Sequence, residues 1–205
     1  MLQRDTERVL ESSLADPVIS RSPHQSTGNA YQTIRLGGSV RGGFRTDRLN
    51  LLSGFDVAGR SACDLGANLG EIPRDLHRAG ASHVDACEYD HFFTQLARYL
   101  TAYNGLPDIN HLQADVAHEG FMRGQYDVCV GLAAYSYMQK NIDYICRQVR
   151  DLMIIETHEV RASAGMPGTF SGSSRTLLTG TAASTAPSCS LAEAGELLDR
   201  LALGG

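Results

Sequence analysis

Lysine is nearly absent from this 205-residue chain: Lys140 is the one lysine among 18 basic residues, and tryptophan does not occur. Acidic residues outnumber basic ones, 23 to 18, which gives a formal net charge of -5. Proteins that bind nucleic acid non-specifically neutralise phosphates with a surplus of lysine and arginine. The composition therefore disfavours a general polyanion binder, and we expect no nucleic-acid partner.

Long apolar runs and paired cysteines are also missing. No apolar run approaches the roughly 18 residues of a membrane span. The first residues, MLQRDTERVLESSLAD, lack the hydrophobic region of a signal peptide. The five cysteines form no C-x-x-C pair, and such pairs are the usual metal-binding or redox spacing. We therefore expect a cytoplasmic protein with no membrane association and no bound metal.

Acidic residues are absent between positions 161 and 189, where 22 of 29 residues are Gly, Ala, Ser, Thr or Pro. Such a segment buries too little apolar surface to offset its ordering entropy. The sequence therefore predicts a flexible linker over 161–189. An amphipathic helix is predicted over 190–205, beginning at the capping box of Ser190 and Glu193.

Residues 1–160, which precede the predicted linker, divide into two parts. Residues 1–43 are predicted to form an N-terminal helix and a glycine-rich lid segment, and residues 44–160 the folded core. Within the core, strands are predicted at 61–66, 83–89, 110–116, 126–134 and 152–157.

Apolar residues recur at helical spacing between these strands. The predicted helix faces are Ile72, Leu76 and Ala79; Phe92, Leu96, Tyr99 and Tyr103; and Ile142, Ile145 and Val149. Strands that alternate with helices imply parallel βαβ units. The predicted fold class is α/β, a doubly wound Rossmann-like three-layer sandwich with a mostly parallel sheet.

A glycine-rich segment, Asp64-Leu-Gly-Ala-Asn-Leu-Gly70, lies where the first strand turns into the first helix. Ligands of doubly wound sheets bind outside the carboxyl ends of the strands, so this turn is a candidate binding loop. Gly66 permits a sharp turn, and Gly70 permits the close approach of a ligand or of the helix. The segment departs from the dinucleotide fingerprint G-x-G-x-x-G, because Asn68 stands in place of the second glycine.

Acidic residues follow the first three predicted strands. Asp64 precedes the turn, where a carboxylate repels a pyrophosphate and stabilises a cation. Glu88 ends the second strand, where doubly wound nucleotide binders place an acid on the ribose hydroxyls. Asp115 ends the third strand, and Asp90 is expected to cap the next helix. Three acids at successive strand ends, without a Walker-type lysine, favour a nucleoside with a cationic tail.

With these motifs in this order, residues 45–158 resemble the class I S-adenosylmethionine-dependent methyltransferases. Residues 59–70 are similar to the first motif of that family in its G-x-N-x-G variant. The resemblance implies S-adenosyl-L-methionine as the cofactor. It places Asp64, Gly66, Asn68 and Gly70 around the methionine moiety, Glu88 on the ribose hydroxyls, Asp115 on the adenine amino group and Val116 beside the adenine ring.

The same resemblance implies methyl transfer. His158 is a candidate general base because an ordinary histidine titrates near neutral pH. The alternative, which the sequence favours slightly, is a loop histidine that is hydrogen-bonded for structure. Tyr135 is a second catalytic candidate, after the fourth strand. Residues 131–134, Gly-Leu-Ala-Ala, replace the Asn/Asp-Pro-Pro-Tyr/Phe signature of members that methylate planar nitrogens. We therefore expect a small-molecule acceptor methylated at oxygen or carbon.

Members of the family usually end with two further strands, the last one antiparallel, and neither is predicted after Thr157. These C-terminal strands are therefore expected to be missing. Two alternatives stay open for this reason: a cofactor-binding but catalytically incomplete module, and a nucleotide-dependent oxidoreductase with an unorthodox turn.

Overall fold

The computed structural model describes residues 8, 12, 32–36, 39–41, 51–132, 134–158 and 175–181. The chain divides into two compact units, Met1–Ala114 and Asp115–Gly205. Of the predicted N-terminal helix, Arg8 and Ser12 are described, and both are helical. The predicted C-terminal helix and most of the predicted lid and linker lie outside the described residues.

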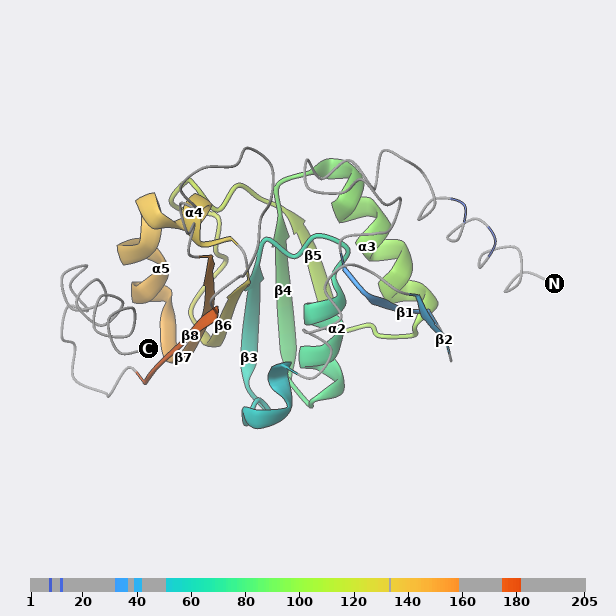
Figure 1. The fold of residues 1–205 in the computed structure, drawn as a ribbon, viewed down its shortest axis with the longest axis horizontal. Coiled ribbons are helices and arrows are strands. Elements are labelled where there is room, and N and C mark those ends of the chain that lie inside the picture. The colour runs from blue at the N-terminus through green and yellow to red at the C-terminus, as the bar shows by residue number, and fades with distance from the viewer. Residues whose placement is uncertain are drawn as a thin grey trace, which may run out of the picture. The chain divides into compact units, whose positions relative to one another are not determined.

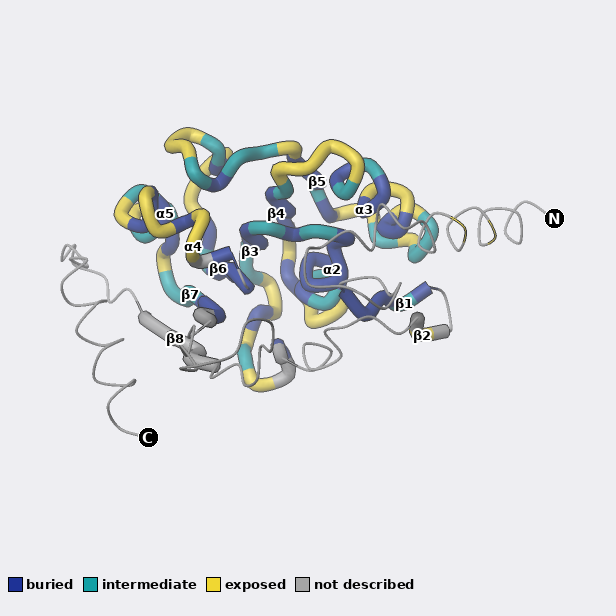
Figure 2. The backbone as a smooth tube through the Cα atoms, turned by 45° about the horizontal axis from the view of Figure 1, so that its top comes forward, coloured by how far each residue is buried: buried dark blue, intermediate teal, exposed yellow. Residues whose placement is uncertain are grey.

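The first unit contains a parallel sheet in the order β5-β4-β3 (Figure 1). Its strands are β3 (Ser61–Leu65), β4 (His83–Glu88) and β5 (Ile109–Gln113). Helix α2 (Glu71–Arg78) connects the first two strands, and α3 (His91–Tyr103) connects the next two. Successive buried residues along β3 and β4 (Figure 2) are typical of parallel strands that are covered on both faces. The predicted βαβ units are confirmed, with strand ends shifted by one to three residues.

Helix α3 lies where the sequence predicts it, but only part of the predicted apolar face is buried. Leu96 is buried and Tyr103 packs against the buried cluster, whereas Phe92 and Tyr99 are 44% and 66% exposed. Leu100 is buried in addition. The exposed position leaves the Tyr99 hydroxyl accessible to water.

A short hairpin from the N-terminal segment also belongs to the first unit. Strand β1 (Ile34–Leu36) pairs antiparallel with β2 (Ser39–Arg41). Ile34 and Leu36 are buried in one cluster with Leu69, Leu96 and Leu100. Apolar burial therefore holds β1 against the glycine-rich segment and α3. The 3-10 helix η2 (Leu51–Gly54) precedes β3.

The second unit contains β6 (Tyr126–Leu132) and β7 (Val149–His158), which pair in parallel. The connection between them is helical, through α4 (Tyr135–Met138), η3 (Gln139–Asn141) and α5 (Ile142–Gln148). Ile142 and Ile145 are buried as predicted. Val149 leaves the helix in an extended conformation and starts β7, three residues before the predicted strand.

Strand β8 (Arg175–Thr181) lies inside the predicted linker and supplies one antiparallel C-terminal strand, so the expectation that both such strands are missing is wrong. It pairs antiparallel with β7 over seven residue pairs, from Leu152 with Thr181 to His158 with Arg175. The small-residue composition of 161–189 hid this strand. Its pairing groups are backbone N–H and C=O, which every residue here supplies, and its three threonines and two leucines suit an extended chain.

Parallel strands joined by helices in both units confirm the predicted α/β, Rossmann-like fold class. None of the helices within the described residues is long and apolar enough to cross a membrane.

Candidate functional site

The glycine-rich segment after β3 forms a tight turn with three residues at positive φ. These are Gly66 (φ 81°), Asn68 (φ 51°) and Gly70 (φ 76°). The turn is closed by the Gly70 N–H, which donates to the Ala67 carbonyl at 2.8 Å. Asn68 is the one residue other than glycine with positive φ in the described part of the chain. Asparagine tolerates this left-handed conformation better than most side chains do.

Gly70 is required by packing within the protein. A Cβ atom at this position would lie 2.8 Å from the His111 ring and 3.2 Å from Ala97 and from Arg74. Its φ of +76° adds strain for any L side chain. The sequence suggested that Gly70 allows a close approach of a ligand or of the helix. In the structure, side chains of α2, α3 and β5 approach it closely. A contact with a ligand stays a prediction.

Two polar side chains of the turn are set deep in the protein. The Asp64 side chain, one residue before the end of β3, is buried. The carboxamide oxygen of Asn68 is buried and has no hydrogen-bond partner among the described residues. A buried acceptor without a partner is costly unless a ligand or water supplies the donor.

Glu88 connects the end of β4 to the turn after β3. Its Oε2 accepts the Asn68 N–H at 2.7 Å, and its Oε1 accepts the Asp90 N–H at 2.9 Å. Burial raises the pKa of the Glu88 carboxyl, and the two backbone N–H donors oppose this rise. The predicted cap is confirmed, since Asp90 accepts from the N–H of Phe92 and Phe93 at the start of α3. The carboxylate is thus fixed in orientation at the carboxyl edge of the sheet.

The predicted adenine-site residues lie in the second unit. Strand β5 ends at Gln113, two residues before Asp115, so the predicted strand is too long. The Asp115 carboxylate accepts the Ala117 N–H at 2.9 Å and lies 2.9 Å from the ring of His118. Val116 is buried, and its carbonyl accepts the Asn141 side chain at 3.2 Å.

The backbone of the second unit places both catalytic candidates beyond one sheet edge. Tyr135 begins α4, directly after β6, and His158 is the last residue of β7. Because β6 and β7 are parallel, with Leu132 opposite Glu156, their carboxyl ends lie at the same edge. The roles of the two residues stay predictions.

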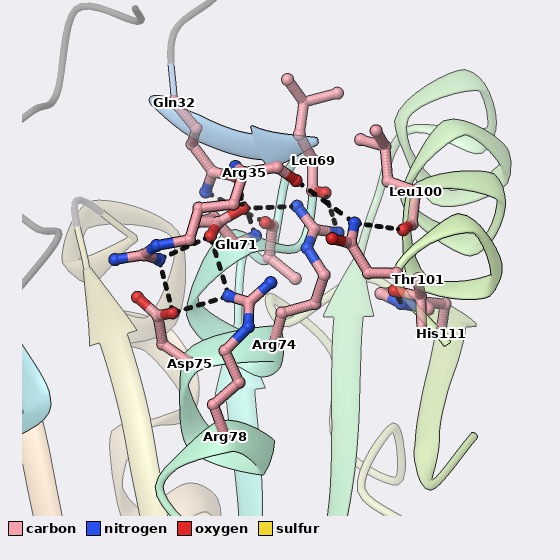
Figure 3. A network of polar contacts seen from close by, with 12 residues as sticks. Gln32, Arg35, Leu69, Glu71, Arg74, Asp75, Arg78, Leu100, Thr101 and His111 are labelled. Carbon is pink, nitrogen blue, oxygen red and sulfur yellow. Dashed lines mark hydrogen bonds and ion pairs between the residues drawn. The ribbon is translucent and has the colours of Figure 1, made fainter. Parts of the chain in front are cut away.

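A buried polar network beneath the turn was missed by sequence reasoning (Figure 3). Its centre is Glu71, the first residue of α2, which is 4% exposed. The Glu71 carboxylate accepts from three guanidinium groups, those of Arg35 (2.7 Å), Arg74 (2.8 Å) and Arg78 (3.1 Å). Burial raises the pKa of Glu71, but Arg74 and Arg35 outweigh burial and hold that pKa below its usual value.

Arg74 is the deepest member of this network, with 0% exposure. It donates to the Leu69 carbonyl at 2.9 Å in addition to Glu71, and burial lowers its pKa. The spacing of Glu71, Arg74 and Arg78 along α2 could have indicated ion pairs on one helix face. Nothing in the sequence indicated that the pairs would be buried, because that depends on β1 covering them.

The chain matches no family model and no curated sequence, whereas many solved structures are similar to it. An S-adenosylmethionine-dependent methyltransferase from Mesorhizobium loti matches with a TM-score of 0.50, at 19% identity over 66% of this chain and 65% of that one. This chain has the class I S-adenosylmethionine-dependent methyltransferase fold.

Two further structures share this methyltransferase fold with the chain. Phosphoethanolamine N-methyltransferase 1 of Haemonchus contortus, solved with phosphoethanolamine and S-adenosylhomocysteine, gives a TM-score of 0.51 at 17% identity, over 61% of this chain and 28% of that one. A precorrin 8W decarboxylase from Methanobacterium thermoautotrophicum gives 0.52 at 14% identity, over 62% and 70%. Two further matches have TM-scores below 0.5, a ribosomal protein L11 methylase from Lactobacillus delbrueckii and a methyltransferase from Listeria monocytogenes. The chain spans 61% and 50% of their lengths.

Proposed function

We propose that this chain binds S-adenosyl-L-methionine at the carboxyl ends of β3 and β4 and transfers its methyl group to a small-molecule acceptor. The observation that carries the proposal is the hydrogen bond between the glycine-rich turn and the Glu88 carboxylate. The Asn68 N–H bonds the Glu88 carboxylate at 2.7 Å, beside a buried asparagine oxygen that has no partner among the described residues. The fold, common to methyltransferases of several acceptors, supports the same reaction class.

The residues of the first unit fit the chemistry of this cofactor. A carboxylate offers about four acceptor positions, and Glu88 uses part of this capacity for backbone N–H groups, among them those of Asn68 and Asp90. The remaining capacity suits the hydroxyls of a ribose. The Asn68 oxygen suits a donor such as the ammonium group of the methionine moiety, and the carboxylate of Asp64 favours the positive charge of that moiety and of the sulfonium. Gly66 and Gly70 shape the turn that carries these groups.

Asp115 and Val116 are proposed to bind the adenine, through the amino group and the ring face respectively. Asp115 follows Ala114, whose N–H donates to the Glu88 carbonyl at 2.8 Å. The Ala117 N–H on one Asp115 oxygen leaves acceptor capacity on that carboxylate.

The cofactor supplies an electrophilic methyl group on a sulfonium. The protein contributes alignment of that methyl group with the acceptor, since in-line displacement depends on proximity and orientation. A hydroxyl acceptor additionally needs a base, and we propose His158 for this role, with Tyr135 as the second catalytic candidate. The acidic net charge supports a small-molecule acceptor over nucleic acid. The missing Asn/Asp-Pro-Pro-Tyr/Phe signature at residues 131–134 favours oxygen or carbon as the methylated atom. We propose a cytoplasmic location from the absence of paired cysteines.

The His158 role predicts a selective loss of turnover. His158→Ala should reduce methyl transfer at least tenfold and leave the dissociation constant of S-adenosylhomocysteine within twofold of wild type, because a base acts on the acceptor and not on the cofactor. The control is His77→Ala, in the last turn of α2, where the ring contacts Asp108 ahead of β5 and not the carboxyl ends of the strands. Equal turnover in both variants would remove His158 as the base.

Thermal unfolding with different ligands distinguishes the cofactor classes. A ligand that binds only the folded state raises the unfolding temperature, and the rise grows with the logarithm of the ratio of ligand concentration to dissociation constant. We expect S-adenosylmethionine and S-adenosylhomocysteine to raise it by several degrees at millimolar concentration, and NAD to leave it unchanged. Stabilisation by NAD alone would favour the oxidoreductase alternative.

A further inference from the structure

The peptide group between Ala67 and Asn68 is held from both sides. Its carbonyl accepts the Gln32 side-chain amide at 3.1 Å and the Gly70 N–H at 2.8 Å. Its N–H donates to Glu88 at 2.7 Å. Because a trans peptide is planar, with C=O and N–H pointing in opposite directions, a partner that fixes the carbonyl also fixes the N–H. Gln32 and Glu88 therefore act on the same rigid unit.

Gln32 makes a second contact at the start of α2. Its side-chain oxygen accepts the Glu71 N–H at 3.3 Å. The N-cap of this helix is Gly70, which has no side chain to cap it, so Gln32 provides the acceptor that an N-cap serine or aspartate normally supplies. Gln32 is 4% exposed. Its carboxamide contacts both the turn, at Ala67, and the helix, at Glu71, although Gln32 belongs to neither.

The position of Gln32 is set by the residues that follow it. Ile34 and Leu36 are buried in the cluster with Leu69. The Arg35 guanidinium lies 2.7 Å from Glu71 and 2.6 Å from Asp75 (Figure 3). Apolar burial and ion pairing thus anchor β1 on α2 and α3, and Gln32 extends from this anchor to the turn.

We propose that Gln32 is a positioning residue for the Glu88 carboxylate, acting through the Ala67–Asn68 peptide. Without its amide, the peptide loses a carbonyl partner, the Asn68 N–H is less firmly directed at Oε2, and the carboxylate gains freedom to rotate. Docking of β1 and ligand binding at Glu88 are then energetically coupled, and the coupling is reciprocal. This part rests on the proposed function, since it takes the ribose of the cofactor as the ligand of Glu88.

The coupling can be measured without any ligand by following the titration of Glu88. The Asn68 N–H lowers the pKa of Glu88, against the burial that raises it. In Gln32→Met, which keeps the length of the side chain and removes its hydrogen bonds, the pKa of Glu88 should rise above the wild-type value. Carbon-13 NMR of the side-chain carboxyl reports this value directly, and amide exchange of Asn68 should become faster in parallel.

The matched control is Asn104→Leu. Asn104 donates to the Arg35 carbonyl at 3.2 Å and to the Leu100 carbonyl at 2.7 Å. It therefore holds the same strand β1 without touching the turn. This variant removes one hydrogen bond to β1, but the buried Ile34 and Leu36 and the Arg35 ion pairs still dock the strand. The Glu88 pKa and the Asn68 exchange should therefore stay close to wild type. If Gln32→Met does not fold, Gln32→Ala removes the same hydrogen bonds without introducing new volume.

Ligand affinity gives the second readout. Loss of one directing hydrogen bond should weaken S-adenosylhomocysteine binding about tenfold in Gln32→Met and less than twofold in Asn104→Leu. An unchanged Glu88 titration in both Gln32 variants would overturn the positioning role, whatever the affinity. If the wild type binds no S-adenosylhomocysteine, the proposed function fails, and the ligand-free titration still decides the role of Gln32.

Discussion

Asn68 combines two features that a purely structural residue rarely has together. Its backbone adopts φ 51°, and its buried carboxamide oxygen has no partner among the described residues. A left-handed residue and an unmet acceptor each destabilise the fold by about 1 kcal/mol or more. Such costs are common at binding sites, where the ligand completes the interactions. Asn68 is therefore the residue whose local structure points most directly to a ligand.

His111 is buried beside this turn and should give the first unit a measurable pH dependence. Its ring lies 2.7 Å from the Thr101 hydroxyl, and burial, with Arg74 and Arg98 nearby, lowers its pKa from 6.5 to about 4. The neutral form therefore belongs to the folded state. Stability from this group is complete above pH 6.5 and is lost as the pH falls toward 4, because the unfolded chain takes up the proton first.

A comparison of unfolding curves tests this titration. The wild type should lose about 2 kcal/mol of unfolding free energy between pH 7 and pH 5 from His111, and His111→Gln should lose less over the same range. Urea unfolding at both pH values measures the difference. His91→Gln, at an exposed histidine, is the control and should follow the wild type. Equal pH dependence in all three proteins would show that His111 is not buried in its neutral form.

Helix α2 depends on β1 as much as on its own residues. Eight residues are too few for a stable isolated helix, and its first N–H is capped from Gln32. Its acid and base side chains share a buried network in which Glu71 meets three arginines. Tertiary contacts therefore fix the helix that carries the end of the candidate binding turn.

Removal of the Glu71 charge should destabilise the first unit strongly. Glu71→Gln leaves Arg74 fully buried without its carboxylate, and breaking a buried ion pair typically costs about 3–5 kcal/mol. Arg78→Met is the matched control, since Arg78 contacts the same carboxylate from a side chain that is 31% exposed and should cost less than about 1 kcal/mol. Chemical denaturation of both variants measures the two values. Similar losses would mean that Arg74 does not depend on Glu71.

The parts of the fold that the sequence predicted are those fixed by local pattern. Apolar runs predicted β3, β4 and β6, and the Gly-x-Asn-x-Gly spacing predicted the turn after β3. The parts that it missed depend on distant residues. Gln32 reaches Ala67 across 35 positions, and β8 forms because β7 offers an edge with which to pair, although its own composition resembles a linker.

The molecule as a whole has a methyltransferase fold, and the proposed reaction draws on residues of both units. Asp64, Asn68 and Glu88 of the first unit are proposed for the methionine moiety and the ribose, and Asp115 and Val116 of the second unit for the adenine. The ends of β6 and β7 are proposed for the acceptor. Cofactor binding at the first unit is the central claim, because every later step depends on it.

Isothermal titration of S-adenosylhomocysteine into the full chain tests this claim most directly. We expect the wild type to bind with a dissociation constant on the order of micromolar, about −8 kcal/mol. Asp64→Asn, which keeps the shape of the side chain and removes its charge, should weaken binding at least tenfold, provided that its circular dichroism spectrum matches the wild type. A folded wild-type chain that releases no binding heat at millimolar ligand, or an Asp64→Asn variant with unchanged affinity, would contradict the account.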